Sequence, residues 1–156
     1  MKILELYLET SVWNFYFADD APEKKAITKQ FFDNLAGYDI FISNIVSKEI
    51  ARAPDEKREL LVNLIDVYEP HELEVTDEAL SLAKKYIEEG ALPTKAFYDA
   101  VHAAVATIYE LDALISWNLK HLASLRRMEK INGVNLKEGY SKKLELITPM
   151  EVSDEI

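Results

Sequence analysis

The chain has 156 residues, of which 49% are hydrophobic, and a formal net charge of −10. This size and composition predict one compact domain, residues 1–156, that buries most of its apolar surface. The negative charge argues against a broadly basic nucleic-acid-binding surface, because phosphate contacts need clustered lysines and arginines. It does not exclude a nuclease, since a bound divalent cation locally reverses the charge of active-site acids.

The sequence contains no cysteine, which excludes disulfides, zinc-thiolate sites and cysteine nucleophiles and fits a reducing cytosol. The N-terminal residues carry a charge within their apolar run and lack a small-residue cleavage signal, so they are not a signal peptide. No apolar run reaches the roughly 18 residues needed to cross a membrane. We therefore expect a soluble, cytoplasmic protein without membrane contact.

Strand-like and helix-like periodicities alternate along the chain, which indicates an α/β fold. A first strand is predicted at Ile3 to Leu8, followed by a helix at Ala21 to Leu35 that has Pro22 near its start. A second strand, Asp39 to Ser43, leads into another helix, for which Asn44 is the expected N-cap.

The second half of the chain continues the alternation. Lys95 to Tyr109 is apolar nearly all round, which predicts a helix buried between layers. The elements are predicted in this order: a helix from Pro54 to Ile65, a weak strand at Leu73 to Val75, helices at Asp77 to Glu89 and Lys95 to Tyr109, a strand at Ala113 to Ser116, a short helix at Leu119 to Met128, a surface loop at Asn132 to Lys143, and a final strand at Leu144 to Ile147.

Three acids and one amide lie at the boundaries of these predicted elements. Glu9 follows the first strand, Glu49 lies about one and a half turns into the helix after the second strand, and Asp99 lies near the start of the buried helix. Asn118 follows the Ala113 to Ser116 strand. A parallel sheet gathers the carboxyl ends of its strands at one edge, and carboxylates are preferred ligands of Mg²⁺ and Mn²⁺. These positions therefore suggest a metal-binding pocket.

Each of these residues also has a purely structural interpretation. Glu9 and Glu49 can be solvated acids in a chain that has 28 of them. Asn118 can instead cap the helix that follows it. His102 lies three residues after Asp99 and can hydrogen-bond to it, although a satisfied core histidine is the commoner case.

A modest basic cluster follows Asn118. It is either a solvated helix end or a set of contacts to RNA phosphates, and the sequence leaves both interpretations open. Its members are Lys120, His121, Arg126, Arg127 and Lys130.

Four segments, taken in order, resemble the PIN-domain nucleases, including the VapC-like toxins of prokaryotic toxin-antitoxin pairs. The resemblance covers essentially the whole chain, and the ending from Leu146 to Val152 also looks like the last strand of that family. The four segments are Tyr7-Leu8-Glu9-Thr10-Ser11-Val12, Ser43-Asn44-Ile45-Val46-Ser47-Lys48-Glu49-Ile50, Asp99-Ala100-Val101-His102-Ala103-Ala104-Val105-Ala106 and Leu114-Ile115-Ser116-Trp117-Asn118-Leu119-Lys120-His121-Leu122.

This resemblance implies a three-layer α/β/α sandwich around a mainly parallel sheet of four to five strands. It also implies hydrolysis of RNA phosphodiester bonds with Mg²⁺ or Mn²⁺. Carried over by position, Glu9, Glu49 and Asp99 are the metal ligands, and Asn118 completes the catalytic set. Ser11, with Thr10 beside it, is expected to support a ligand or a metal-bound water.

The resemblance also implies an antitoxin partner, a basic residue of which occupies the acidic pocket. The aromatic run Trp13, Phe15, Tyr16 and Phe17 can stack on unpaired bases, pack internally, or contact an antitoxin or a second subunit of a homodimer.

The chain departs from the commonest family pattern at two positions. Glu9 stands where Asp is more usual, and Asn118 falls at or beside the fourth acidic position. A longer acid moves a ligand, and Mg²⁺ tolerates geometric error poorly. The alternative to an active ribonuclease is therefore a catalytically weak or inactive binding or regulatory module with the same fold.

Overall fold

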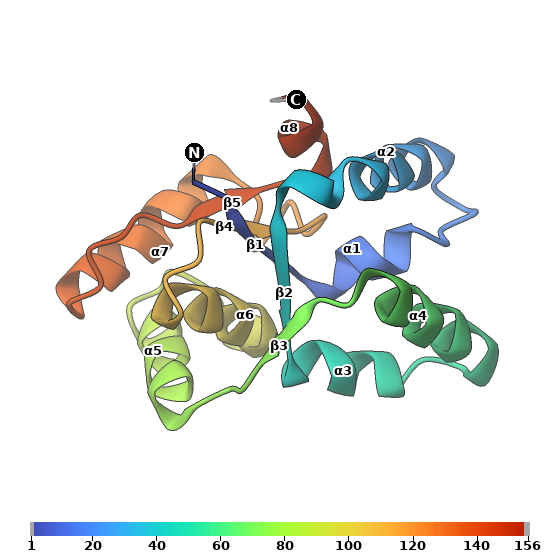
Figure 1. Ribbon diagram of the computed structural model, residues 1–156. Helices are drawn as coiled ribbons and strands as arrows, with labels where there is room; N and C mark the ends of the chain where they lie inside the picture. Colours follow the sequence, from blue (N-terminus) through green and yellow to red (C-terminus); the bar gives the residue numbers. More distant parts are fainter. Residues whose placement is uncertain (1, 155–156) are drawn as a thin grey trace.

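A computed structural model describes residues 2–154, which form a five-stranded, all-parallel sheet with helices around it (Figure 1). The strand order is β3-β2-β1-β4-β5. The strands are β1 (Glu5–Leu8), β2 (Asp39–Ser43), β3 (His71–Leu73), β4 (Ala113–Ile115) and β5 (Glu145–Ile147). The predicted α/β fold with a parallel sheet is confirmed.

Helices cover both faces of this sheet. Figure 1 shows α5, α6 and α7 on one side of the strands and α1, α2 and α4 on the other, which makes three layers. The helices are α1 (Thr10–Phe15), α2 (Pro22–Asp33), α3 (Asn44–Ala51), α4 (Asp55–Tyr68), α5 (Asp77–Glu88), α6 (Phe97–Ile108), α7 (Leu125–Lys137) and α8 (Pro149–Asp154). Short 3₁₀ turns lie at Leu35–Gly37 and Thr94–Ala96.

Helix α6 is the central helix of the core, as its composition predicts. Every residue from Ala100 to Thr107 is buried. The helix packs extensively on α5 and also contacts α3 and β4. Its small alanine side chains permit close packing between these elements, because a protein interior is packed almost without voids.

The segment that follows Asn118 differs from the prediction. Residues 119–124 form turns, and helix α7 begins only at Leu125, so the helix predicted at Leu119 to Met128 is wrong in place and length. The Ser124 hydroxyl caps α7 by accepting the backbone N–H of Arg127.

The loop predicted at Asn132 to Lys143 is also wrong over its first half, because α7 continues to Lys137. The Asn132 side chain is tied to both backbone groups of Leu144, at 2.9 Å each. Ile131 and Val134, two residues of α7, are buried. These tertiary contacts stabilise a helix across an Asn-Gly pair that by itself is typical of a turn.

Other differences are smaller. The short helix α1 was not predicted, β1 begins at Glu5 instead of Ile3, and β3 lies at His71–Leu73, two residues before its predicted start. Ser43, not Asn44, caps α3 through a hydroxyl that accepts the N–H of Ile45.

The strand order reverses beside β1. From β1 the chain adds β2 and β3 on one side and then crosses to add β4 and β5 on the other. In open parallel sheets such a reversal leaves a ligand-binding crevice beyond the carboxyl ends of the strands. Residues that follow β1 and β4 therefore line one site.

No helix in residues 2–154 is both long and apolar enough to cross a membrane. The prediction of one domain over 1–156 stays a prediction, and its ends, residue 1 and residues 155–156, lie outside the described range.

The opposite, amino-terminal edge of the sheet is held together by Asp112. Its carboxylate accepts the backbone N–H of Glu5 at 2.8 Å and contacts the ammonium groups of Lys2 and Lys142, both at 3.0 Å. Partial burial favours the neutral acid, but these three donors outweigh it and lower the pKa of Asp112 below its usual value.

We predict that Asp112→Asn lowers the free energy of unfolding at pH 7 by about 1–2 kcal/mol, since bonds to a charged acceptor are lost. The pKa of Asp112 is lower in the folded protein than in the unfolded chain. The stability that the charged side chain contributes is therefore present above the pKa of the unfolded chain and is lost as the pH falls through the pKa of the folded protein. Urea unfolding of both proteins at pH 7 and near pH 3 measures this, and a difference that does not shrink in acid contradicts it.

Candidate active site

The structure places the three predicted acids on separate segments around the carboxyl end of β1. Glu9 directly follows β1 and caps α1, Glu49 is in the second turn of α3, and Asp99 is in the first turn of α6. The buried side chain of His102 lies among them, and its pKa is affected by the charges of all three. The expectation that these acids gather at one sheet edge agrees with this arrangement.

Glu9 is the most deeply buried of the three, with 6% of its surface exposed. A single oxygen, Oε1, accepts the Ser11 N–H at 3.1 Å, the Ser11 hydroxyl at 2.5 Å and the Ser116 hydroxyl at 2.8 Å. Burial raises the pKa of Glu9, although the positive charge of His102 and these hydroxyl donors act in the opposite direction. Ser11 thus makes two hydrogen bonds to Glu9, and its role in supporting a metal ligand stays a prediction.

Glu49 is held in the same way by a hydroxyl and an imidazole. Its Oε1 accepts the Thr10 hydroxyl at 2.7 Å and lies 2.8 Å from Nε2 of His102. Burial favours the neutral acid, but the hydrogen bonds from His102 and Thr10 and the charge of His102 outweigh it and lower the pKa of Glu49. Glu49 is therefore a carboxylate at neutral pH.

Asp99 has its two side-chain partners on the segment after β4. Its Oδ2 accepts the Asn118 amide at 3.0 Å and lies 3.3 Å from Nδ1 of His121. Burial raises the pKa of Asp99, with His102, His121 and Asn118 opposing that shift. The amide oxygen of Asn118 accepts the backbone N–H of His121, so both ends of this side chain bind protein atoms.

One oxygen of each acid makes no hydrogen bond to any of the described residues. Within residues 2–154, every contact of Glu9 and of Glu49 is made through Oε1, and every contact of Asp99 is made through Oδ2. No buried side-chain oxygen or nitrogen of the described residues lacks a partner, so the second oxygens reach the surface. They are available to an external ligand.

The donor chemistry of these residues fits a hard divalent cation, which prefers carboxylate oxygens. No three acid or histidine side chains of the described chain converge closely enough to form a complete ion site. The assignment of Glu9, Glu49 and Asp99 as metal ligands stays a prediction.

The basic cluster divides into two groups. The guanidinium of Arg127 donates to the carbonyls of Ala91 and Lys120, at 2.6 and 3.3 Å, so it joins two loops. His121 faces Asp99. Lys120, Arg126 and Lys130 are exposed and remain candidates for RNA contact.

The aromatic run after Glu9 is largely internal. Trp13 is fully buried and packs on Phe32 with ring centroids 5.2 Å apart. Phe15 lies against Trp117, and the Lys24 ammonium lies over both of these rings, 5.3 and 5.5 Å from their centroids. Of the interpretations that the sequence left open for these aromatic residues, internal packing therefore explains most of their contacts.

Two residues of the site went unnoticed in the sequence. Ser116, which is fully buried, binds Glu9 and also accepts the Asn118 N–H. It was predicted as the last residue of the strand Ala113 to Ser116, so its place at a strand end was a signal similar to the one that singled out Glu9. Tyr7 lies inside β1 and bonds to His102, and its pattern position indicated only core packing.

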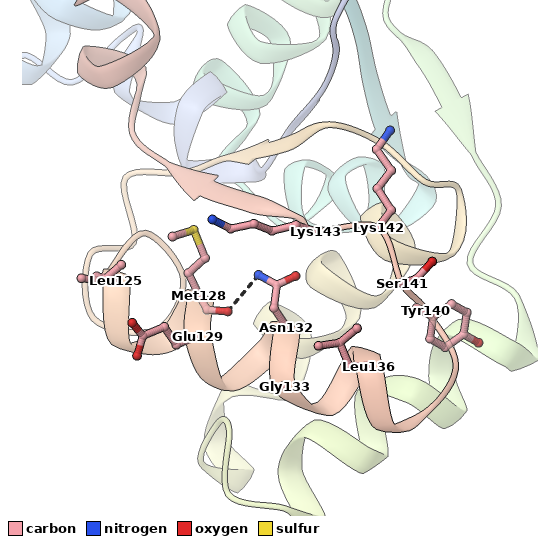
Figure 2. A pocket seen from close by; sticks show the side chains of 10 residues that line it. All are labelled: Leu125, Met128, Glu129, Asn132, Gly133, Leu136, Tyr140, Ser141, Lys142 and Lys143. Carbon is pink, nitrogen blue, oxygen red and sulfur yellow. Dashed lines mark hydrogen bonds between the residues drawn. The ribbon is translucent and has the colours of Figure 1, made fainter.

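A separate hollow of about 400 Å³ lies along the outer side of α7 (Figure 2). Leu125, Met128 and Leu136 project into it from the helix, and Tyr140 to Lys143 form the other wall. None of the three acids lines this hollow, so it is distinct from the site around β1.

A family comparison decides the classification of the chain. Residues 6–125 match the model of the PIN domain. The chain belongs to the PIN domain family. PIN domains are nucleases, which supports a hydrolase that acts on phosphodiester bonds. The matched segment contains Glu9, Glu49, Asp99 and Asn118.

Solved structures show the same fold at low sequence identity. A toxin-antitoxin complex from Klebsiella pneumoniae contains a chain with 17% identity and a TM-score of 0.58, over 78% of this chain and 93% of that one. VapBC2 from Rickettsia felis, solved with a DNA fragment from its promoter, gives 15% identity and a TM-score of 0.54, over 91% and 98% of the respective chains. No curated protein matches this PIN domain.

We predict that Glu9→Gln increases the stability of the metal-free protein at pH 7 by about 0.5–2 kcal/mol, because it removes a buried charge but keeps an acceptor for Ser11 and Ser116. The pKa of Glu9 is higher in the folded protein than in the unfolded chain. The charged Glu9 side chain therefore begins to destabilise the fold as the pH rises above the pKa of the unfolded chain, and the effect is complete above the pKa of the folded protein. Chelator-treated samples unfolded in urea at several pH values test this, and equal stability at pH 7 argues against it.

Proposed function

We propose that this PIN domain is an endoribonuclease that depends on Mg²⁺ or Mn²⁺ and is the toxin of a type II toxin-antitoxin pair. The observation that carries the proposal is the arrangement of the acids. Three carboxylates from β1, α3 and α6 are each anchored through one oxygen and leave the other oxygen accessible.

Glu9, Glu49 and Asp99 are the residues that would hold the ion. A bound Mg²⁺ or Mn²⁺ would lower the pKa of a coordinated water and stabilise charge on the scissile phosphate. The hydroxyls of Ser11, Ser116 and Thr10 fix the orientation of the two glutamates. Asn118 acts as a positioning residue for Asp99, because its amide N–H donates to the Asp99 carboxylate.

The toxin role is supported by family membership together with the neighbours in fold, which come from toxin-antitoxin complexes. It entails an antitoxin partner that covers the acidic pocket. RNA as substrate, a homodimeric state and a cytoplasmic location belong to the same proposal.

We predict that Asp99→Asn and Glu9→Gln each reduce Mn²⁺-dependent RNA cleavage by about 100-fold or more, because each removes a charged ligand and several kcal/mol of transition-state stabilisation. Asp66→Asn, an exposed acid on α4, is the matched control and should keep full activity. Initial rates on a single-stranded RNA give the comparison, and full activity in both site variants would sink the proposal.

The second candidate function is a binding or regulatory module without catalysis. It is favoured by Asn118 at a position expected to be acidic and by the contact of His121 with Asp99. Calorimetric titration with Mn²⁺ separates the two functions. Saturable binding that Asp99→Asn abolishes supports the nuclease, and the absence of binding supports the module.

We also predict that replacing Lys120 and Arg126 by alanine weakens RNA binding and reduces the slope of log K against log salt by about one for each phosphate contact removed. Lys84→Ala, an exposed lysine on α5, serves as the control. The slope is measured from RNA binding at several salt concentrations, with Asp99→Asn present in every protein to prevent cleavage. An unchanged slope would show that Lys120 and Arg126 do not contact RNA phosphates.

A further inference from the structure

A continuous chain of buried hydrogen bonds joins the start of α3 to Glu49, later in the same helix. The Ile45 N–H donates to the Ser43 hydroxyl at 3.3 Å, and this hydroxyl is 2.7 Å from the Tyr7 hydroxyl. The Tyr7 hydroxyl is 2.6 Å from Nδ1 of His102, whose Nε2 is 2.8 Å from Oε1 of Glu49. The chain of contacts therefore runs through α3, β1 and α6.

The chemistry of the last bond fixes the direction of donation. A carboxylate has no proton to give, so Nε2 of His102 must carry the hydrogen, in the neutral ring and in the charged one alike. In the neutral ring Nδ1 then accepts from Tyr7, and in the charged ring it donates to Tyr7. His102 is fully buried and Tyr7 has no exposed surface, so neither has water as an alternative partner.

The arrangement also restricts what Glu49 can do. Two donors, from Thr10 and His102, meet the same oxygen, Oε1. The carboxylate plane is thereby fixed, and Oε2 has no hydrogen-bond partner within the described residues. A glutamate has three side-chain torsions, so without such bonds it would sample many orientations of that oxygen.

We propose that His102, supported by Tyr7, is a positioning residue that fixes the free oxygen of Glu49 for the ligand of the acidic site. This role rests on the proposed function for the identity of the ligand, Mg²⁺ or Mn²⁺. His102 touches neither substrate nor ion. Groups that orient a ligand from behind typically change metal affinity by about 10- to 100-fold when they are removed.

Tyr7→Phe tests the role at a distance, because the Tyr7 hydroxyl bonds to Ser43 and His102 and makes no hydrogen bond with Glu49 in the described structure. Its matched control is Tyr86→Phe, since Tyr86 is equally buried and its hydroxyl bonds to Asn135 at 2.5 Å and Thr107 at 3.3 Å, among α5, α6 and α7. Both variants remove one buried tyrosine hydroxyl, so both lower thermal stability.

Calorimetric titration with Mn²⁺, at a temperature where all variants are folded, gives the first readout. We expect Tyr7→Phe to weaken Mn²⁺ binding by about tenfold and Tyr86→Phe to leave it unchanged. Equal affinities in wild type and Tyr7→Phe, or equal losses in the two tyrosine variants, overturn the proposal.

A second pair of variants, at His102, distinguishes the effect of the hydrogen bond to Glu49 from the effect of side-chain packing. His102→Gln keeps a donor near the position of Nε2, whereas His102→Met has similar length and no donor. We expect Gln to retain Mn²⁺ affinity within about threefold and Met to lose about tenfold, since only the donor orients Glu49. Equal affinity in the two variants contradicts a role in orientation.

Nitrogen NMR of the metal-free protein distinguishes failure of this proposal from failure of the proposed function. A protonated Nε2 that is coupled to a Glu49 carboxylate supports positioning even if the wild type binds no Mn²⁺, and the proposed function then fails alone. An unprotonated Nε2 overturns the positioning role whatever the metal titration shows.

Discussion

The burial of Glu9 at the carboxyl end of β1 is the constraint on which the rest of the site depends. A carboxylate in this position requires donors, and the Ser11 backbone and hydroxyl, together with the Ser116 hydroxyl, supply them. Ser11 belongs to α1 and Ser116 follows β4, so the hydrogen bonds of Glu9 connect the helix after β1 to the neighbouring strand.

The electrostatics of the site follow from placing three acids around two histidines. Burial raises the pKa of Glu9 and Asp99, whereas the bonds from His102 and Thr10 lower that of Glu49. The positive charge that His102 can carry compensates part of this negative charge in the absence of any other cation. Holding like charges together in a partly buried site lowers stability, because burial weakens the screening that water provides.

The sequence supported the prediction of the fold because most elements agree with their local signals. Strands such as Asp39 to Ser43 and the buried helix around Val101 have one clear periodicity and one clear environment. Prediction failed where the deciding contact is distant in the chain. Helix α7 continues through Asn132 because that side chain binds the backbone of Leu144, a partner that no local pattern reveals.

The acids of the site were predictable for a related reason. Glu9 follows a strand, Asp99 lies in the first turn of a helix, and Glu49 lies in the second turn of a helix that follows a strand. The order of α/β units places such positions at one edge of a parallel sheet. Ser116 carried a similar signal and was overlooked. Tyr7 carried no such signal, and the spacing of His102 indicated only a bond to Asp99 or a place in the core, because the partners of a buried polar side chain inside a strand or helix are not encoded locally.

By itself, the sequence determined the α/β class and the parallel order of units, since these follow from periodicity, and it singled out three acids by their positions along these units. Only the tertiary structure decided which oxygen of each acid is held, that Asn118 binds Asp99 instead of standing free, and that His102 serves Glu49 instead of Asp99. The physical reason is that hydrogen bonds are short and directional. Their partners are fixed by the packing of β1, α3 and α6 in space, which spacing along the chain does not encode.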